Sequence, residues 1–284
     1  MAEIFTLLPF WRGVQLTWFH LILIASLQGV TEFLPVSSSG HLALIPLLTG
    51  LRDQGLSVDV AAHAGTLAAV IVYFRHDMKR AVWGFAELAR GTTATANAQL
   101  SLCLVVATVP VIIAGGFIQL VGLTHWLRDP QVIGLATLGF GLLLYWADRI
   151  GKQTKTMSDW NLRTAVIFGL WQAAALVPGA SRSGVTMTAA RFCGFDRRHA
   201  ARLAMLMSIP VIAAASLLTL AEILHSGDGI ALREAGIAAV LSFLSALVAL
   251  AAMMKMLETF TYTPFVIYRV ILGIGVLAFA WSGG

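Results

Sequence analysis

Six stretches of the chain are apolar and long enough to cross a lipid bilayer, for which a helix needs about 20 residues. The composition agrees, because 58% of the residues are hydrophobic and only 12% are charged, whereas about a quarter are charged in soluble domains. We therefore expect an all-α polytopic membrane protein that forms one integral membrane domain over residues 1–284. The predicted spans are 58–74, 100–122, 131–147, 201–224, 234–254 and 264–281.

Two further apolar regions, 15–50 and 163–192, are interrupted by polar motifs. The first contains LPVSSSG at 34–40, and the second contains VPGASRSG at 177–184. Proline and glycine stop helices, and each flanking run is short for a span. Both regions are predicted to be re-entrant pairs, in which a helix enters the membrane, the chain turns, and a second helix leaves on the same side.

The order of these segments predicts an inverted-topology repeat. Each half, 14–148 and 163–284, has one re-entrant pair followed by three spans, and an odd number of spans makes the second half enter from the opposite face. An offset of 144 positions supports the repeat because it aligns identical residues in the two breaks. These are Gln28 with Gln172, Ser37 with Ser181, Ser39 with Ser183, and Gly40 with Gly184.

The basic residues predict the orientation of the chain. Most Lys and Arg residues fall on one side of the predicted layout, in the segments 75–90, 149–163 and 191–202 and at Lys255. By the positive-inside rule this side is cytoplasmic, and both termini then lie outside. The segment with Arg75, Lys79, Arg80 and Arg90 is predicted to be a loop. The net charge of +5 is thus assigned to topology, and no nucleic-acid partner is expected.

Irregular backbone inside a membrane is tolerated only where it is buried in protein or lines a wet cavity. We therefore expect the two breaks to face each other across a polar pocket. Ionisable groups at this depth are costly and indicate a functional site. The pocket would contain Glu32, His41 and Arg182, with hydroxyl groups from Ser37, Ser38, Ser39, Ser181, Ser183 and Thr186.

The second break has the composition of an oxyanion-binding site. Small residues before a helix start expose backbone N–H groups, and the Arg182 guanidinium is a planar, permanently charged fork that suits phosphate oxygens. The structural alternative is that Ser181 caps the next helix while Arg182 forms an ion pair with Glu32.

The first break brings a carboxylate, a hydroxyl and an imidazole within ten residues, which is the set needed for hydrolysis. Glu32 could accept a proton from Ser38 or from water, and His41 could act as an acid or attack phosphorus itself. Two other residues are ambiguous. His63 is either a buried core histidine or part of the cavity wall, and Arg269 either reaches phosphate or pairs across helices.

The motifs QGVTEFLPVSSSGH and PGASRSGVT, with the pair Tyr268 and Arg269, resemble the signature regions of the undecaprenyl-diphosphate phosphatases of the bacitracin-resistance type. The resemblance covers nearly the whole chain. It implies hydrolysis of undecaprenyl diphosphate to undecaprenyl phosphate and inorganic phosphate. By this resemblance Glu32, Ser38, His41 and Arg182 are candidate catalytic residues. The candidate substrate-binding residues are Gln28, Ser37, Ser39, Ser181, Ser183, Thr186 and Arg269.

The resemblance also implies a divalent cation, Mg²⁺ or Ca²⁺, with Glu32 as a ligand. Gln28 occupies a position where the family has an acidic or amide residue, and an amide there weakens cation binding. The ion is therefore expected to be held mainly by the diphosphate. The expected location is the bacterial plasma membrane, with the site open to the outer face, and a homodimer is left open.

Two other classes of function remain as alternatives. Inverted repeats with broken helices also build transporters, so a polyprenyl-phosphate transporter or flippase is the second hypothesis. A non-catalytic anion-binding membrane protein is the third. Glu32, Ser38 and His41 favour the enzyme, because a transporter has little use for a nucleophile beside a base.

Overall fold

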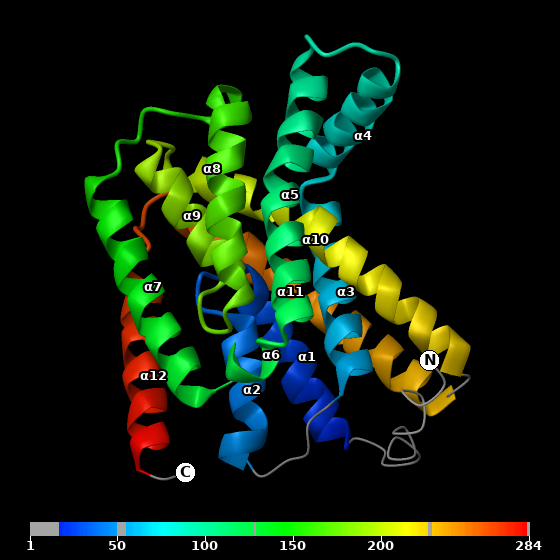
Figure 1. Ribbon diagram of the computed structural model, residues 1–284, viewed down its shortest axis with the longest axis vertical. Coiled ribbons are helices and arrows are strands. Elements are labelled where there is room, and N and C mark those ends of the chain that lie inside the picture. The colour runs from blue at the N-terminus through cyan, green and yellow to red at the C-terminus, as the bar shows by residue number, and fades with distance from the viewer. Residues whose placement is uncertain (1–16, 50–54, 128, 227–228, 283–284) are drawn as a thin grey trace.

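The computed structural model describes residues 17–49, 55–127, 129–226 and 229–282, and this part of the chain is helical without a β-strand (Figure 1). Two short 3₁₀ turns, Met157–Asp159 and Ala174–Leu176, lie beside α8. The helices are α1 (Trp18–Phe33), α2 (Ser38–Thr49), α3 (Leu56–Tyr73), α4 (Arg75–Ala89), α5 (Ala96–Val121), α6 (Thr124–Leu127), α7 (Pro130–Ile150), α8 (Leu162–Ala173), α9 (Arg182–Phe192), α10 (Arg197–Ser226), α11 (Gly229–Met256) and α12 (Thr263–Trp281).

Five of the described helices are long and apolar enough to cross a membrane, namely α5, α7, α10, α11 and α12. A sixth span is obtained only if α3 and α4 are taken together, and these two helices meet at an angle of 91°. The expectation of an all-helical chain with several candidate membrane spans is confirmed at this level.

The two interrupted regions form the helix pairs α1–α2 and α8–α9. Residues 34–37 separate α1 from α2, and residues 177–181 follow the 3₁₀ turn before α9. In Figure 1 the pair α1–α2 lies in the lower half of the molecule and the pair α8–α9 in the upper half. The two breaks therefore approach each other from opposite ends.

The α1 helix is held against α11 by a close contact at Gly29. A Cβ atom at this position would lie 2.6 Å from the backbone oxygen of Ser242 on α11, so a larger residue would push the helices apart. This contact fixes the helix from which Gln28 and Glu32 project.

The loop predicted for residues 75–90 is wrong, because Arg75–Ala89 forms the helix α4. Ala81 and Gly84 are buried on one face of α4, and the Ser101 hydroxyl of α5 donates to the Ala81 carbonyl at 2.7 Å. Charged residues were interpreted as a loop, although the exposed face of a surface helix carries the same residues.

Arg191, in the last turn of α9, is fully buried. Its Nε donates to Asp148 Oδ1 at 2.9 Å and its Nη2 to the Gly151 carbonyl at 2.9 Å. The same carboxylate oxygen accepts from Arg197 at 2.8 Å. Arg191 thus ties the end of α9 to the end of α7, and its charge is compensated by a buried carboxylate.

Candidate active site

Glu32 lies one turn after Gln28 on the same face of α1, and both side chains are buried. Gln28 Nε2 donates to Glu32 Oε2 at 2.8 Å. The helix ends at Phe33 because Pro35 follows, and proline restricts the residue before it to an extended backbone. The carboxylate therefore lies at the inner end of a broken helix.

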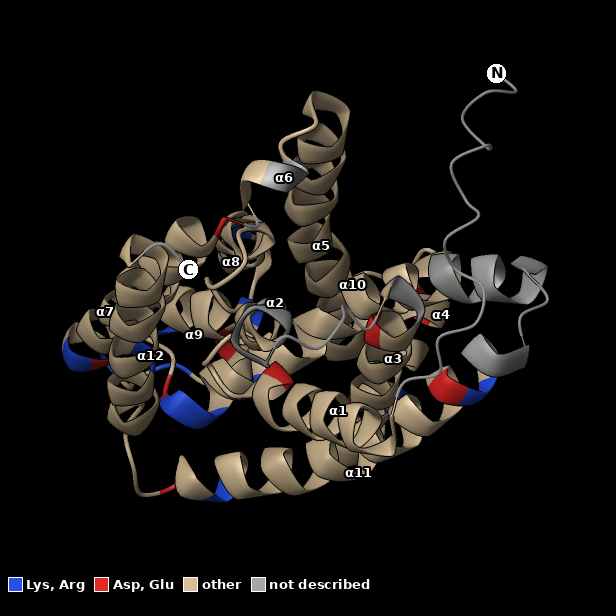
Figure 2. Ribbon diagram, turned by 90° about the horizontal axis from the view of Figure 1, so that it is seen from below, with Lys and Arg blue, Asp and Glu red and all other residues tan. Residues whose placement is uncertain are grey.

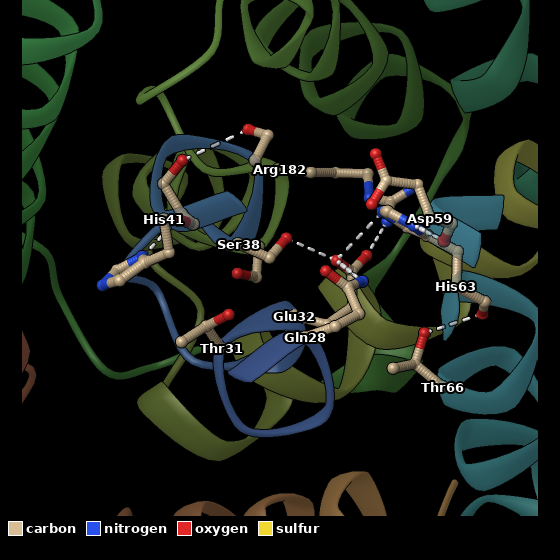
Figure 3. A network of polar contacts seen from close by, with 12 residues as sticks. Gln28, Thr31, Glu32, Ser38, His41, Asp59, His63, Thr66 and Arg182 are labelled. Carbon is tan, nitrogen blue, oxygen red and sulfur yellow. Dashed lines mark hydrogen bonds and ion pairs between the residues drawn. The ribbon is translucent and has the colours of Figure 1, made fainter. Parts of the chain in front are cut away.

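Ser38 is the first residue of α2, and its Oγ donates to Glu32 Oε2 at 2.6 Å (Figure 3). The chain can reverse between the two residues because Ser37 adopts a left-handed backbone with φ of 74°. The predicted pairing of a hydroxyl with a carboxylate is therefore present, at the distance of a charge-assisted hydrogen bond.

Arg182 comes from the second break and forms an ion pair with the other carboxylate oxygen, Glu32 Oε1. The Glu32 side chain is 3% exposed and that of Arg182 is 19% exposed. The pairing predicted as the structural alternative is thus present. It also brings the hydroxyl, the carboxylate and the guanidinium into one cluster, drawn in Figure 3.

The two breaks share one backbone feature. Ser37 and Ser181 are the only residues other than glycine with positive φ in the described chain, at 74° and 70°. Each precedes a helix and accepts a hydrogen bond from the third residue on, Gly40 N at 3.3 Å and Gly184 N at 3.1 Å. This backbone is strained for a serine, so the matched strain indicates that both turns are built for the site.

Hydrogen bonds also join the breaks directly. Gly179 N donates to Ser37 Oγ at 3.1 Å, and Ser183 Oγ donates to the Leu34 carbonyl at 3.0 Å. Ser37, Ser181 and Ser183 therefore have structural contacts, whatever else they bind.

The remaining predicted hydroxyl groups differ in access. Ser39 is exposed, and its Oγ lies 3.4 Å from Ser37 Oγ. Thr186 is fully buried, and its hydroxyl has no hydrogen-bond partner among the described residues. A buried hydroxyl without a partner is costly, which makes Thr186 a candidate for a contact that forms only with a ligand.

His41 does not join the cluster around Glu32. Its ring points away from the carboxylate (Figure 3). His41 Nδ1 lies 2.6 Å from the Ser37 carbonyl, and Nε2 is hydrogen-bonded to the Tyr268 hydroxyl of α12. The short spacing in the sequence suggested a single group of three residues, but the Ser38 hydroxyl turns to Glu32 while the His41 ring turns to the Ser37 carbonyl and to Tyr268.

The imidazole beside the carboxylate belongs to His63 of α3, whose Nε2 lies 3.6 Å from Glu32 Oε2. Its Nδ1 lies 2.7 Å from the Asp59 carbonyl, and its side chain is 30% exposed. His63 is therefore partly exposed and not a fully buried core histidine, and its imidazole faces the carboxylate. The available signal was that an ionisable residue in an apolar span is functional by default.

Arg269 is fully buried and donates only to backbone carbonyls. Nη1 donates to Pro35 of the first break at 3.2 Å, Nη2 to Gly179 of the second break at 2.9 Å, and Nε to Thr137 of α7 at 3.0 Å. Of the two interpretations, these contacts favour pairing across elements. Arg269 links both breaks to α7 and α12.

A family model for bacitracin resistance protein BacA matches residues 21–275 of the chain. The chain belongs to this family. The undecaprenyl-diphosphatase of Roseobacter denitrificans is 54% identical over 267 residues, which cover 94% of this chain and 100% of that protein. The undecaprenyl-diphosphatase of Jannaschia sp. is 53% identical, with 93% and 99% covered, and that of Maricaulis maris is 46% identical, with 92% and 98% covered.

The BacA family match includes both breaks and the Tyr268–Arg269 pair. The matched region therefore contains Glu32, Ser38 and Arg182 and all the residues described above that contact them. His63 and Tyr268, which no motif argument selected as site residues, lie inside the same matched region.

The BacA-type site offers little to a metal ion on its own. The described residues contain no group of three or more His, Cys, Asp or Glu side chains that could hold one. Glu32 already has Arg182 on one oxygen and Ser38 and Gln28 on the other. Gln28 Oε1 is buried without a hydrogen-bond partner among the described residues, so one carboxylate and one amide oxygen are the protein ligands available.

Proposed function

We propose that this BacA family protein hydrolyses undecaprenyl diphosphate to undecaprenyl phosphate and inorganic phosphate, recycling the lipid carrier for cell-wall synthesis and so conferring bacitracin resistance. The observation that carries the proposal is the cluster in which Ser38 donates to Glu32 while Arg182 of the other break pairs with the same carboxylate. The names of the relatives, at 42–54% identity over nearly the full chain, support the substrate.

Ser38 is the nucleophile that the distances favour. In this mechanism Ser38 Oγ bonds to the terminal phosphorus while its proton passes to Glu32 Oε2, 2.6 Å away. The bond from phosphorus to the bridging oxygen breaks, and its electron pair leaves with undecaprenyl phosphate. Glu32 passes this proton to the departing undecaprenyl phosphate and is a carboxylate again. Water then attacks the phosphoserine, Glu32 accepts a proton from that water and gives it to Ser38 Oγ as phosphate leaves. Attack by His41 or directly by water are the two competing mechanisms.

Arg182 changes partner in this proposal. The guanidinium holds Glu32 in the resting site, and an entering diphosphate offers it two or more oxygens in its place. Once Arg182 turns to phosphate, Glu32 loses its strongest counter-charge and becomes a better base. The N–H groups at the start of α9 and the unpaired Thr186 hydroxyl would stabilise the charge that develops.

An apolar groove of about 610 Å³ is the proposed place for part of the polyprenyl tail. It is lined by Val30 of α1, Leu34 just after α1, Val248 and Ala252 of α11, and Phe265 of α12. In Figure 2, α11 runs along one edge of the molecule, apart from α12 and α7. Val30 lies on the exposed face of α1, away from the buried Gln28 and Glu32, and Leu34 follows the last residue of the helix, so the tail would pass the end of the broken helix.

The proposed divalent cation would bind through the diphosphate, with Glu32 and the Gln28 amide oxygen as the protein's contribution. Mg²⁺ and Ca²⁺ both take oxygen ligands, and the ion would neutralise phosphate charge. A homodimer stays a prediction.

The membrane arrangement we propose is six spans and two re-entrant pairs, in two inverted halves, in the bacterial plasma membrane. The equal backbone turns at Ser37 and Ser181, 144 positions apart, support the repeat. The site is proposed to open to the outer face, opposite the end that carries Arg197, Arg198 and Arg202.

The test is phosphate release from a polyprenyl diphosphate by the purified protein in detergent, followed by rapid quenching. An acid-stable phosphoserine that disappears in Ser38→Ala supports the mechanism, an acid-labile phosphohistidine supports His41, and the absence of both supports direct water attack. If no phosphate is released while lipid moves between leaflets of proteoliposomes, the transporter hypothesis replaces the enzyme.

A further inference from the structure

Tyr268 belongs to one of the sequence motifs, but the motif does not indicate a function for its side chain. We propose that Tyr268 is a positioning residue that holds the His41 imidazole in one orientation and one tautomer for the reaction. This inference rests on the proposed function, because it requires His41 to act during phosphate transfer.

The tautomer of His41 follows from its two contacts. A backbone carbonyl can only accept, so the 2.6 Å contact between His41 Nδ1 and the Ser37 carbonyl places the ring proton on Nδ1. In the neutral ring Nε2 then carries a lone pair. The Tyr268 hydroxyl, which is hydrogen-bonded to Nε2, is the donor of that bond.

The orientation of the ring is fixed as well as its tautomer. The His41 and Tyr268 rings are stacked, with centroids 5.6 Å apart and planes that differ by 9°. A phenylalanine could keep this stacking but not the hydrogen bond. The two contributions can therefore be separated by one substitution.

Tyr268 is itself placed by its neighbour. Arg269, fully buried, donates to the carbonyls of Pro35 in the first break and of Gly179 and Ala180 in the second. This anchors the backbone of α12 to both breaks at the position of Tyr268. The Tyr268 side chain is 44% exposed, so it lies at the edge of the site and not in the core.

The arrangement bears on the role of His41. A ring whose Nε2 accepts from Tyr268 has no proton to give at that atom. In the resting site both ring nitrogens of His41 are engaged. Attack on phosphorus by Nε2 would first require the bond to Tyr268 to break, and a role as general acid would first require a proton on Nε2.

A double-mutant cycle in the full-length protein tests the proposal, with phosphate release from a polyprenyl diphosphate as the readout. We expect Tyr268→Phe to lower kcat about tenfold, with KM within about twofold of wild type, as for the loss of one hydrogen bond. In a His41→Gln background the same substitution should change nothing further. Tyr145→Phe is the matched control, since the Tyr145 hydroxyl contacts Arg149 on α7, and it should leave kcat unchanged.

A second readout is independent of turnover. In ¹⁵N-histidine NMR of the detergent-solubilised protein, His41 should show the neutral form with the proton on Nδ1, and Tyr268→Phe should change that signal. A Tyr268→Phe variant with wild-type kcat, or an equal loss of kcat in the His41→Gln background, overturns the proposal. If His41→Gln keeps full turnover, the positioning role falls while the phosphatase stands. If wild type releases no phosphate, the proposed function itself falls.

Discussion

The two breaks use one backbone design for two kinds of chemistry. Ser37 and Ser181 have nearly the same φ, and each accepts from a glycine three residues on. The first helical residues that follow are Ser38 and Arg182, which are also 144 positions apart. One break thus presents a hydroxyl and the other a cation from equivalent backbone positions.

This difference suggests separate roles for the two breaks in the proposed mechanism. The first break would supply the groups that move protons, Ser38 and Glu32, and the second the charge that meets phosphate, Arg182. Because the two sets come from opposite ends of the molecule (Figure 1), neither break forms a site alone. The predictions below are therefore ordered by how completely each substitution removes the contribution of one break.

The largest effect is expected for the first break. Glu32→Gln keeps the shape but cannot accept the Ser38 proton, so kcat should fall about 10²–10⁴-fold in a phosphate-release assay. Gln172 occupies the position equivalent to Gln28 in the other half. Gln172→Glu adds a carboxylate there, and its kcat is compared with that of Glu32→Gln to test whether a carboxylate matters at any position or only at residue 32. A kcat of Glu32→Gln within threefold of wild type would show that Glu32 is not the general base.

Arg182→Lys is expected to have the next largest effect, on the second break. Lysine keeps the charge but loses the planar fork, and kcat/KM should fall about 10²–10³-fold. Arg198→Lys is a matched control, because Arg198 is exposed and pairs with Glu258 away from the breaks. Equal losses in both variants would mean that the guanidinium at 182 has no special role.

The backbone turns themselves should contribute to stability. Ser37→Ala and Ser181→Ala remove the cap while keeping the positive φ, and each should lower the free energy of unfolding by about 1–2 kcal/mol. The loss in free energy of unfolding should be larger for Ser37→Ala, because Ser37 Oγ also accepts a hydrogen bond from Gly179 N of the other break. Thermal unfolding in detergent measures this order, and a larger loss at Ser181 would contradict it.

The smallest effect is expected from adding a carboxylate to the first break. Gln28→Glu should lower the Mg²⁺ concentration needed for half-maximal activity severalfold, because the new charge lies beside Glu32. Titration of activity with Mg²⁺ measures it. A requirement that is unchanged or higher would show that the ion does not bind at this carboxylate.

Much of the site could be predicted from the sequence. Helix-breaking motifs in apolar runs pointed to Glu32, Ser38 and Arg182, and their contacts are present in the structure. Two features were missed because they depend on the direction in which a side chain points. His63 faces Glu32 although it is 31 positions away, and His41 points to Tyr268 although it is close to Glu32 in the chain.

The interpretation of charged residues was less reliable. Arg191 and Arg269 are both fully buried, although the sequence assigned Arg191 only to the cytoplasmic side and left Arg269 between phosphate binding and pairing across helices. A guanidinium can be buried when carbonyls and a carboxylate surround it. Those acceptors come from distant segments, and nothing in the local sequence reveals them.

The sequence by itself determined that the chain is helical and suited to a membrane, where it breaks, and which polar groups the breaks carry, because apolar length and helix-stopping residues are local properties. Only the tertiary structure decided which of these groups meet. The distances from Glu32 to Arg182 and His63, and from His41 to Tyr268, are set by the packing of helices that are far apart in the chain, and the distance from Glu32 to Ser38 is set by the turn at Ser37.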